Sequence, residues 1–239
     1  VQTCALPILG RFKLDLAAYR RILPLGLSEG LNELSNGLVI FLFNHTILRV
    51  IGEGALASYT IISYVNTLVL MTMTGTAQGM QPLVSFHLGA GERKNCHRLL
   101  KYGVSLIAAF SLVSFALGEL GAPAIVSAFL PTDSAVFSYS ISALRMYSSS
   151  FLVLGFNVIF AAFFTAVERP VFAFSISFGR SLVLLVASLL ILSSLFGDKG
   201  IWFSTLCSEL LCLCLTAFCA WRYFRSHRRE NPLPEAEQV

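Results

Sequence analysis

The sequence has few charged residues. Only 13% of its 239 residues are Asp, Glu, Lys or Arg, whereas 56% are hydrophobic, and the mean hydropathy is +0.74. An ordinary soluble domain carries roughly 25% charged residues, and the smaller share here could not cover the surface of a water-soluble fold of this length. The composition therefore excludes a soluble domain and indicates a membrane protein.

The sequence also lacks the patterns of metal sites and of common catalytic centres. Its six Cys and four His residues follow no metal-ligand spacing, and no His has a carboxylate at such a spacing. Most of the Cys residues lie in one apolar segment, where Cys behaves as a small hydrophobic residue, so we expect no disulfides. Hydrolysis in a membrane would need a nucleophile with a base or a metal triad. We therefore expect no enzyme activity and no cofactor.

Long apolar runs are what the sequence has instead. A helix needs about 20 mostly apolar residues to cross the ~30 Å hydrocarbon core of a bilayer. Ten-residue segments of alternating polarity are not seen, and backbone polar groups in lipid must be hydrogen-bonded internally, so the runs predict helices. We predict an all-α, polytopic membrane bundle over residues 23–225, with six transmembrane helices at about 23–48, 55–88, 99–130, 136–166, 171–196 and 200–224.

Basic residues are unevenly distributed between the two predicted sides of the membrane. Most Lys and Arg residues lie in the amino-terminal arm, in the loops after the second and fourth predicted helices and in the tail. The other side has Arg49 and Lys199. Because Lys and Arg are enriched in cytoplasmic loops, both ends of the chain are predicted to be cytoplasmic, in the inner (plasma) membrane. The basic runs therefore indicate topology, and no nucleic-acid partner is expected.

The first predicted helix carries a polar stripe. Glu29, Glu33 and Asn36 fall within one arc of its helical wheel. Carboxylates inside a membrane are costly and usually mark ion or proton pathways. Two of them four residues apart disfavour ionisation of each other. We predict that Glu29 and Glu33 couple transport to protons or cations, and that Asn36 and Asn44 face a substrate cavity. Alternatively, Glu29 is interfacial, and Glu33, one turn deeper, is the coupling residue.

Two further helices carry polar residues at depth. On the fourth predicted helix, Arg145 and Asn157 are candidates for the same substrate cavity, although the stripe they belong to also fits helix packing. Arg180 and Glu209 each lie nine residues into their helices. At ~1.5 Å per residue this depth is about 13 Å, near the bilayer midplane. We therefore predict a structural ion pair between Arg180 and Glu209.

The end of the second predicted helix reads TGTAQGMQPLVSFHLGAGERK. Its glycines and Pro82 loosen the helix, and no Lys-Ser/Thr follows a glycine-rich turn, so it is not a phosphate-binding loop. This stretch resembles the multidrug and toxin extrusion (MATE) family, whose second helix in each half ends with a pattern like G-x-x-Q-P-L-x-x-x-x-x-G-A-G before a basic loop. The resemblance covers about residues 9–225 and includes, in the family's order, GLSEGLNELSNGLVIFLFN, ALRMYSSSFLVLGFNVIFAAFFTAVERP and GRSLVLLVASLLILSSLFGDKGIWFSTLCSELL.

The resemblance implies a secondary active multidrug or organic-compound efflux antiporter driven by H⁺ or Na⁺. Such transporters have two six-helix bundles with small amphipathic or cationic substrates held between them. This chain resembles the second bundle, so its partners would be membrane lipid and a missing amino-terminal half, and residues 9–22 would be the cytoplasmic linker. Some members hold a cation with a Glu of the bundle's first helix, which Glu29 or Glu33 matches, and an acidic residue of its fourth. That helix here offers Asn157 and Arg145, which favours protons, or carboxylates of another bundle.

The two ends of the chain carry separate expectations. Residues 1–8, VQTCALPI, back-translate to GTT CAG ACG TGT GCT CTT CCG ATC, a common sequencing-library adapter, so we expect an adapter artefact there and a fragment of a longer protein. Residues 226–239 are polar and are expected to form a disordered cytoplasmic tail. Other functions stay open: a lipid-linked oligosaccharide flippase of the same superfamily, or a non-transport module that dimerises.

Overall fold

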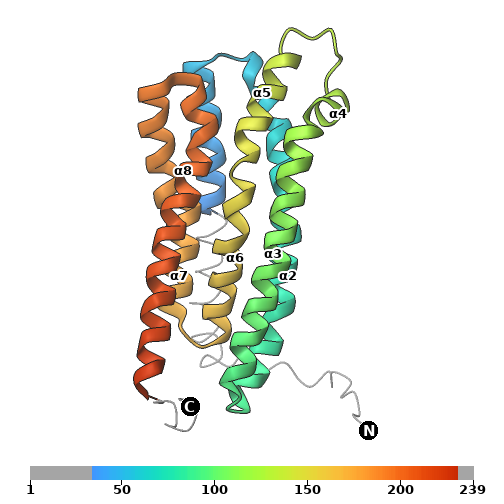
Figure 1. The fold of residues 1–239 in the computed structure, drawn as a ribbon. Helices are drawn as coiled ribbons and strands as arrows, with labels where there is room; N and C mark the ends of the chain where they lie inside the picture. The colour runs from blue at the N-terminus through green and yellow to red at the C-terminus, as the bar shows by residue number, and fades with distance from the viewer. Residues whose placement is uncertain (1–33, 231–239) are drawn as a thin grey trace, which may run out of the picture.

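The computed structural model describes residues 34–230, with side chains to residue 225, and this part of the chain is helical without a strand (Figure 1). The predicted all-α, polytopic membrane fold is confirmed. Glu29 and Glu33 lie outside the described residues. The elements are a first helix at Leu34–Val50, α2 (Gly54–Gly89), α3 (Arg93–Leu120), α4 (Ala122–Ser127), α5 (Phe137–Ser148), α6 (Phe151–Ala166), α7 (Pro170–Phe178), the π-helical turn η1 (Gly179–Val183) and α8 (Leu184–Glu230).

The element α8 is a hairpin of two helices. A straight helix would separate residues 180 and 209 by about 43 Å, yet side chains of Arg180 and Glu209 are in contact. The chain reverses at Gly197, whose φ of 59° and ψ of −128° are not helical. A Cβ at Gly200 would clash with the Leu192 carbonyl oxygen, so the two arms approach too closely there for any other residue.

The helices include several that are long and apolar enough to cross a membrane. By length and composition these are Gly54–Gly89, Arg93–Leu120 and Pro170–Arg225, and α5 with α6 forms a fourth candidate that is bent by 42°. Because Pro170–Arg225 folds back at Gly197, it provides two crossings. In Figure 1 the α8 reversal and the α4–α5 segment lie at one end of the bundle, and the α6–α7 turn and the C-terminal end of α8 lie at the other.

The predicted helix 136–166 is broken in the structure. It is divided into α5 and α6 at Ser149 and Ser150. Ser148 Oγ donates to the Leu144 carbonyl oxygen at 2.7 Å, and Ser149 Oγ donates to that of Met146 at 2.6 Å. Such back-bonding by serine bends helices. Side chains of α5 and α6 therefore do not form one continuous stripe.

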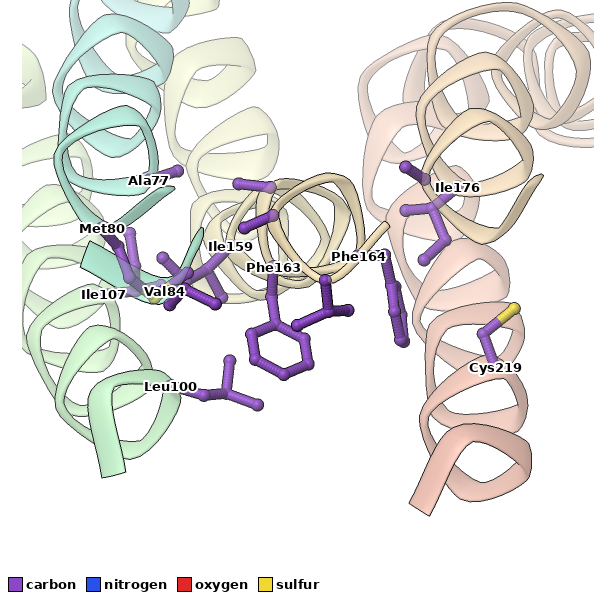
Figure 2. Close-up of a cluster of buried hydrophobic side chains, with 14 of the residues drawn as sticks. Ala77, Met80, Val84, Leu100, Ile107, Ile159, Phe163, Phe164, Ile176 and Cys219 are labelled. Carbon is purple, nitrogen blue, oxygen red and sulfur yellow. The ribbon is translucent and has the colours of Figure 1, made fainter. Parts of the chain in front are cut away.

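Two apolar clusters fill the bundle. One surrounds Phe163 and Phe164 of α6, which Figure 2 shows between Leu100 of α3 and Cys219 of α8. The other surrounds Trp202 and Phe151, both fully buried. Close helix contact depends on small residues: a Cβ at Gly155 of α6 would lie 2.6 Å from Ile107 Cγ2. Along α6 and α8, buried polar side chains interrupt the apolar ones: Asn157, Glu209 and Thr216.

Candidate functional site

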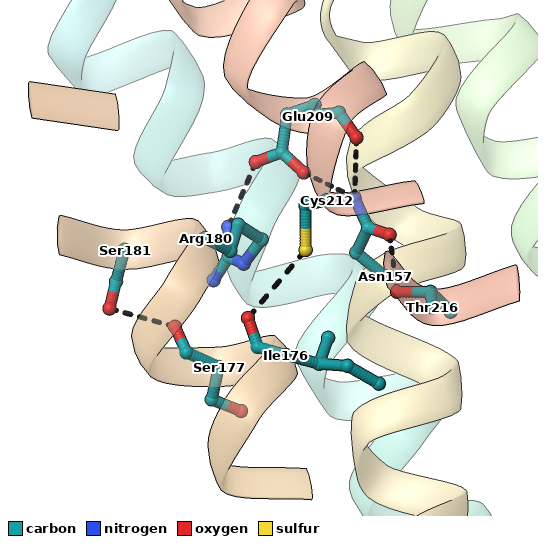
Figure 3. A network of polar contacts seen from close by, with 8 residues as sticks. All are labelled: Asn157, Ile176, Ser177, Arg180, Ser181, Glu209, Cys212 and Thr216. Atoms are coloured by element: carbon teal, nitrogen blue, oxygen red, sulfur yellow. Dashed lines mark hydrogen bonds and ion pairs between the residues drawn. The ribbon is translucent and has the colours of Figure 1, made fainter. Parts of the chain in front are cut away.

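The polar layer consists of Asn157, Arg180, Glu209 and Thr216 (Figure 3). Arg180 Nη1 lies 3.2 Å from Glu209 Oε1, and Asn157 Nδ2 donates to Glu209 Oε2 at 2.7 Å. The same Nδ2 donates to the Glu209 carbonyl oxygen at 3.0 Å, and Thr216 Oγ1 donates to Asn157 Oδ1 at 2.9 Å. Both carboxylate oxygens therefore have donors. Because a carboxylate only accepts, these contacts also fix the orientation of the Asn157 amide.

Helix geometry brings these residues together. On the returning arm of α8, Glu209, Cys212 and Thr216 recur at i, i+3 and i+7, so they share one face. That face meets Asn157 of α6, and Cys212 Sγ lies 3.6 Å from the Ile176 carbonyl oxygen of α7. Arg180 lies in η1, a π-helical turn. Such turns occur frequently at functional sites.

The two side chains of the ion pair differ in their exposure to solvent. The exposed fraction of the Glu209 side chain is 4%, whereas that of Arg180 is 21%. An ionised carboxylate at this depth is tolerated only because it is paired and hydrogen-bonded. The Arg180 contact at 3.2 Å is longer than the 2.7–2.9 Å usual for charge-assisted hydrogen bonds. Asn157 is thus the closer of the two partners of Glu209, and Arg180 is the looser one.

Two cavities adjoin the polar layer. The upper cavity, about 310 Å³, lies beside the half of α2 that begins at Gly54. The lower cavity, about 270 Å³, lies beside the following half of α2. Residues lining the upper cavity include Asn36, Tyr59, Asn66, Tyr147, Arg180 and Glu209. Residues lining the lower cavity include Thr74, Gln78, Gln81, Asn157, Ser177 and Arg180. Arg180 therefore lines both, and Arg180, Glu209 and Asn157 form the wall between them.

Only some of the residues predicted to face a substrate cavity line one of these two cavities. Asn36 lines the upper cavity and Asn157 the lower one. Asn44 is half-buried on the first helix and is not among the lining residues of either. Arg145 is not among the lining residues of either cavity, and its Nε donates to the Glu119 carbonyl oxygen in the last turn of α3 at 3.0 Å, so its role in a cavity stays a prediction.

The residues of the predicted ion pair, by contrast, are in contact. Arg180 and Glu209 meet as their depths suggested. Sequence reasoning missed Thr216, although its i+7 spacing from Glu209 was a usable signal. It also missed Gln78 and Gln81, which are three residues apart and so share a helix face. Their role as cavity lining could not be recognised without the position of α6.

A second polar cluster closes the turn between α2 and α3. His87 Nδ1 lies 2.6 Å from Glu92 Oε2, and Asn95 Nδ2 donates to the same oxygen at 2.8 Å. Gly91, with φ of 76°, allows the sharp turn between the two helices. The hydrogen bonds from Asn95 and His87 lower the pKa of the Glu92 carboxyl below its usual 4.5. This cluster is exposed and lies at the opposite end of the bundle from Gly197.

Comparison with known proteins identifies the family of this bundle. The family model described as MatE matches residues 30–190, more than half of the chain and most of the helices just described. The chain belongs to the MatE family. This match confirms the family predicted from the sequence. MatE proteins are multi-pass membrane transporters and not enzymes.

Individual MatE relatives are distant in sequence. Multidrug export protein MepA of Staphylococcus haemolyticus (strain JCSC1435) is 24% identical over 207 residues, which are 87% of this chain and 42% of that protein. An FAD transporter of Shewanella oneidensis (strain MR-1) is 22% identical over 188 residues, which are 79% of this chain and 40% of that protein. The chain thus spans less than half the length of these two relatives.

Solved structures share the fold. The inward-facing conformation of a multidrug resistance MATE family transporter of the MOP superfamily superimposes with a TM-score of 0.82 at 20% identity. The alignment covers 92% of this chain and 51% of that one. The outward-facing conformation gives a TM-score of 0.79 at 21% identity, over 93% of this chain and 50% of that one. At this identity the likeness establishes the MatE fold, and this chain corresponds to half of it.

Proposed function

We propose that this chain is the carboxy-terminal six-helix half of a secondary active efflux antiporter for drugs or other organic compounds. Membership in the MatE family, the relative named Multidrug export protein MepA and the coverage of half a solved transporter support the proposal. The observation that carries a transport role for this half is the buried Arg180–Glu209 pair beside two polar-lined cavities. Charged groups at such depth are costly, and in membrane proteins they usually mark ion or substrate pathways.

The proposed mechanism is alternating access. This bundle would rock against the amino-terminal bundle of the complete protein, around substrate held between them. An ion drives such a cycle only if it binds the two states with different affinity. Glu29 and Glu33 are the proposed coupling carboxylates, with H⁺ or Na⁺ as the ion. Asn36 follows Glu33 by three residues in the sequence and lines the upper cavity. This position supports a polar path between the proposed coupling carboxylates and that cavity.

We place the protein in the inner (plasma) membrane. In the proposed orientation the α2–α3 turn lies on the cytoplasmic side. Basic residues gather at that end of the bundle, as the rule for cytoplasmic loops requires. Those with described positions are Arg93, Lys94, Arg98, Lys101, Arg169, Arg222 and Arg225. The opposite end has Arg49 and Lys199. The upper cavity, beside the Gly54 half of α2, would then lie toward the outside.

Small amphipathic or cationic compounds are the first proposed substrate class. The upper cavity combines aromatic side chains, Tyr59 and Tyr147, with the carboxylate of Glu209 and the amides of Asn36 and Asn66. Aromatic faces and carboxylates both attract cations. A second candidate is an organic anion, because one relative is an FAD transporter and because Arg180 lines both cavities.

Efflux by the complete protein tests this proposal. The complete protein would be reconstituted in lipid vesicles, and ethidium or fluorescein efflux would be followed under an imposed pH or Na⁺ gradient. We expect ion-driven efflux of ethidium, loss of it in Glu33→Gln, and retention in Glu53→Gln, which neutralises an exposed residue beside α2. Efflux of fluorescein alone would favour the second substrate class. Unchanged ion-driven efflux in both Glu33→Gln and Glu29→Gln would reject their coupling role.

A further inference from the structure

The wall between the two cavities contains a titratable pair. Glu209 lines the upper cavity, Asn157 lines the lower cavity, and Arg180 lines both. We propose that Glu209 is a proton-binding group, and that its charge determines whether Arg180 closes the passage between the upper and the lower cavity. This role is additional to that of Glu29 and Glu33 and depends on the proposed transport function only for an activity readout.

The contacts of Glu209 show what a proton would change. With Glu209 ionised, its Oε1 holds Arg180 Nη1 at 3.2 Å, and its Oε2 is held by Asn157 Nδ2 at 2.7 Å. Protonation removes the charge that keeps the guanidinium in the wall. Asn157 remains hydrogen-bonded to the Glu209 backbone carbonyl oxygen, so the α6–α8 contact survives the change. Only Arg180 loses the main reason for its position.

Arg180 has a place to move once the pair is broken. Its guanidinium has five N–H donors, and Glu209 is the side-chain acceptor that the described structure gives it. An unpaired guanidinium at this depth is costly unless it reaches water or another acceptor. Because Arg180 already lines both cavities and is partly exposed, a change of its rotamer moves the charge along a cavity wall and leaves Asn157 and Thr216 as the layer.

The local backbone favours such movement. Arg180 belongs to η1, where five residues form a π-helical turn between α7 and the first arm of α8. Ser181 Oγ donates to the Ser177 carbonyl oxygen at 2.8 Å, so side chains already take part in the hydrogen bonding of this turn. Glu209 and Asn157, in contrast, lie within regular helices. The proposal therefore assigns the movement to Arg180 and keeps Glu209 and Asn157 in place.

Few titratable groups compete with Glu209 for the proton. Tyr147 of α5 and Tyr59 of α2 share the upper cavity with it, and Cys212 lies one turn away on α8. These groups are neutral near pH 7 at their ordinary pKa values. The neighbours on the remaining elements are Asn157 of α6 and, on the first helix, Asn36, neither of which titrates. Glu209 and Arg180 are thus the charged groups of this layer among the described residues.

Thiol labelling of the complete protein in vesicles tests the gate directly. Ser177→Cys places a thiol in the lower cavity, in a background without other cysteines, and a membrane-impermeant maleimide is added from the upper-cavity side. We expect labelling to be faster at low pH than at high pH, and to be fast at both in Glu209→Gln. The expected change is about tenfold or more, because a minor open state becomes the major one. Ser63→Cys, in the upper cavity, should label equally throughout.

Several outcomes separate the gate from a purely structural pair. Slow, pH-independent labelling of Ser177→Cys in a folded Glu209→Gln protein overturns the proposal. If Glu209→Gln does not fold, the Arg180→Gln/Glu209→Gln pair removes both charges together, and fast labelling at both pH values is expected. Slow labelling in that pair also overturns it. Glu53→Gln controls for loss of an acidic residue elsewhere. Labelling needs no substrate, so absence of efflux would reject the proposed function and leave this test intact.

Discussion

Two acidic residues of the bundle, each with two side-chain nitrogen partners, lie in opposite surroundings. Glu209 is paired with Arg180 and Asn157 and its side chain is 4% exposed, whereas Glu92 is held by His87 and Asn95 and its side chain is 51% exposed. The distances differ in the unexpected direction: the exposed contact between His87 and Glu92 is shorter, at 2.6 Å, than the buried one between Arg180 and Glu209, at 3.2 Å. Distance alone therefore does not rank these contacts.

Burial decides what each contact is worth. An exposed pair exchanges its partner for water at little cost, and such pairs contribute little to stability. A buried charge that loses its partner has no such replacement, so breaking the pair is costly even where forming it gains little. Removing one partner of the Arg180–Glu209 pair should therefore lower stability strongly, whereas removing both together should cost less. Removing the Glu92 contacts should change stability little.

The largest expected effect is that of removing one partner of the buried pair. Arg180→Ala leaves the Glu209 carboxylate without its cation, and we expect a loss of about 3–5 kcal/mol in stability and a lower folded yield. Adding Glu209→Ala to it should cost much less than Glu209→Ala alone, because the uncompensated charge is then gone. Thermal unfolding of the complete protein in detergent measures both. Strictly additive losses would show that the two side chains are not coupled.

A smaller effect is expected from the neutral partner. Asn157→Ala removes a donor to the Glu209 carboxylate and an acceptor for Thr216, and we expect a loss of about 1–3 kcal/mol. Thr216→Val removes the outer hydrogen bond alone and should cost less, since the carboxylate keeps both donors. The same unfolding assay compares them. If Thr216→Val were the more damaging change, the hydrogen bonds would not extend outward from Glu209 as described.

Packing beside the polar layer should be sensitive as well. A Cβ at Gly155 would lie 2.6 Å from Ile107 Cγ2 and 2.9 Å from Met73 Sδ. Gly155→Ala is therefore expected to cost about 1–3 kcal/mol through overpacking. Gly75→Ala is the matched control, because nothing lies within 4 Å of its added Cβ, and it should be neutral or slightly stabilising. Equal unfolding temperatures for the two variants would contradict the close approach of α3 and α6.

Regular helices made part of this arrangement predictable from the sequence. Residue counts from the helix ends placed Arg180 and Glu209 at similar depth, and the pairing followed because the two arms are adjacent and antiparallel. The family resemblance was also visible in the sequence, because four stretches occur in the family's order, among them the helix end at Gly89–Gly91. The π-helical turn at Gly179–Val183 gave no sequence signal, yet it did not disturb the depth estimate.

Other features depend on tertiary geometry that no count supplies. The stripe along residues 136–166 predicted neither the bend of 42° between α5 and α6 nor the contact of Arg145 with the end of α3. Asn157 lines the lower cavity, and its amide also holds the Glu209 carboxylate, a contact that depends on the register of α6 against α8. The coupling role of Glu29 and Glu33 remains a prediction.

The smallest expected effect concerns the exposed cluster. Since hydrogen bonds from Asn95 and His87 lower the pKa of Glu92 in the folded protein, the cluster stabilises the α2–α3 turn above the usual pKa of 4.5 and loses this contribution as the pH falls below that value. Glu92→Gln should remove the pH dependence and change overall stability little, because the group is exposed. Proteolysis at the α2–α3 turn, followed from neutral to acidic pH, measures the local effect. If Glu92→Gln lowered the global stability as much as Arg180→Ala does, the ranking by burial would be refuted.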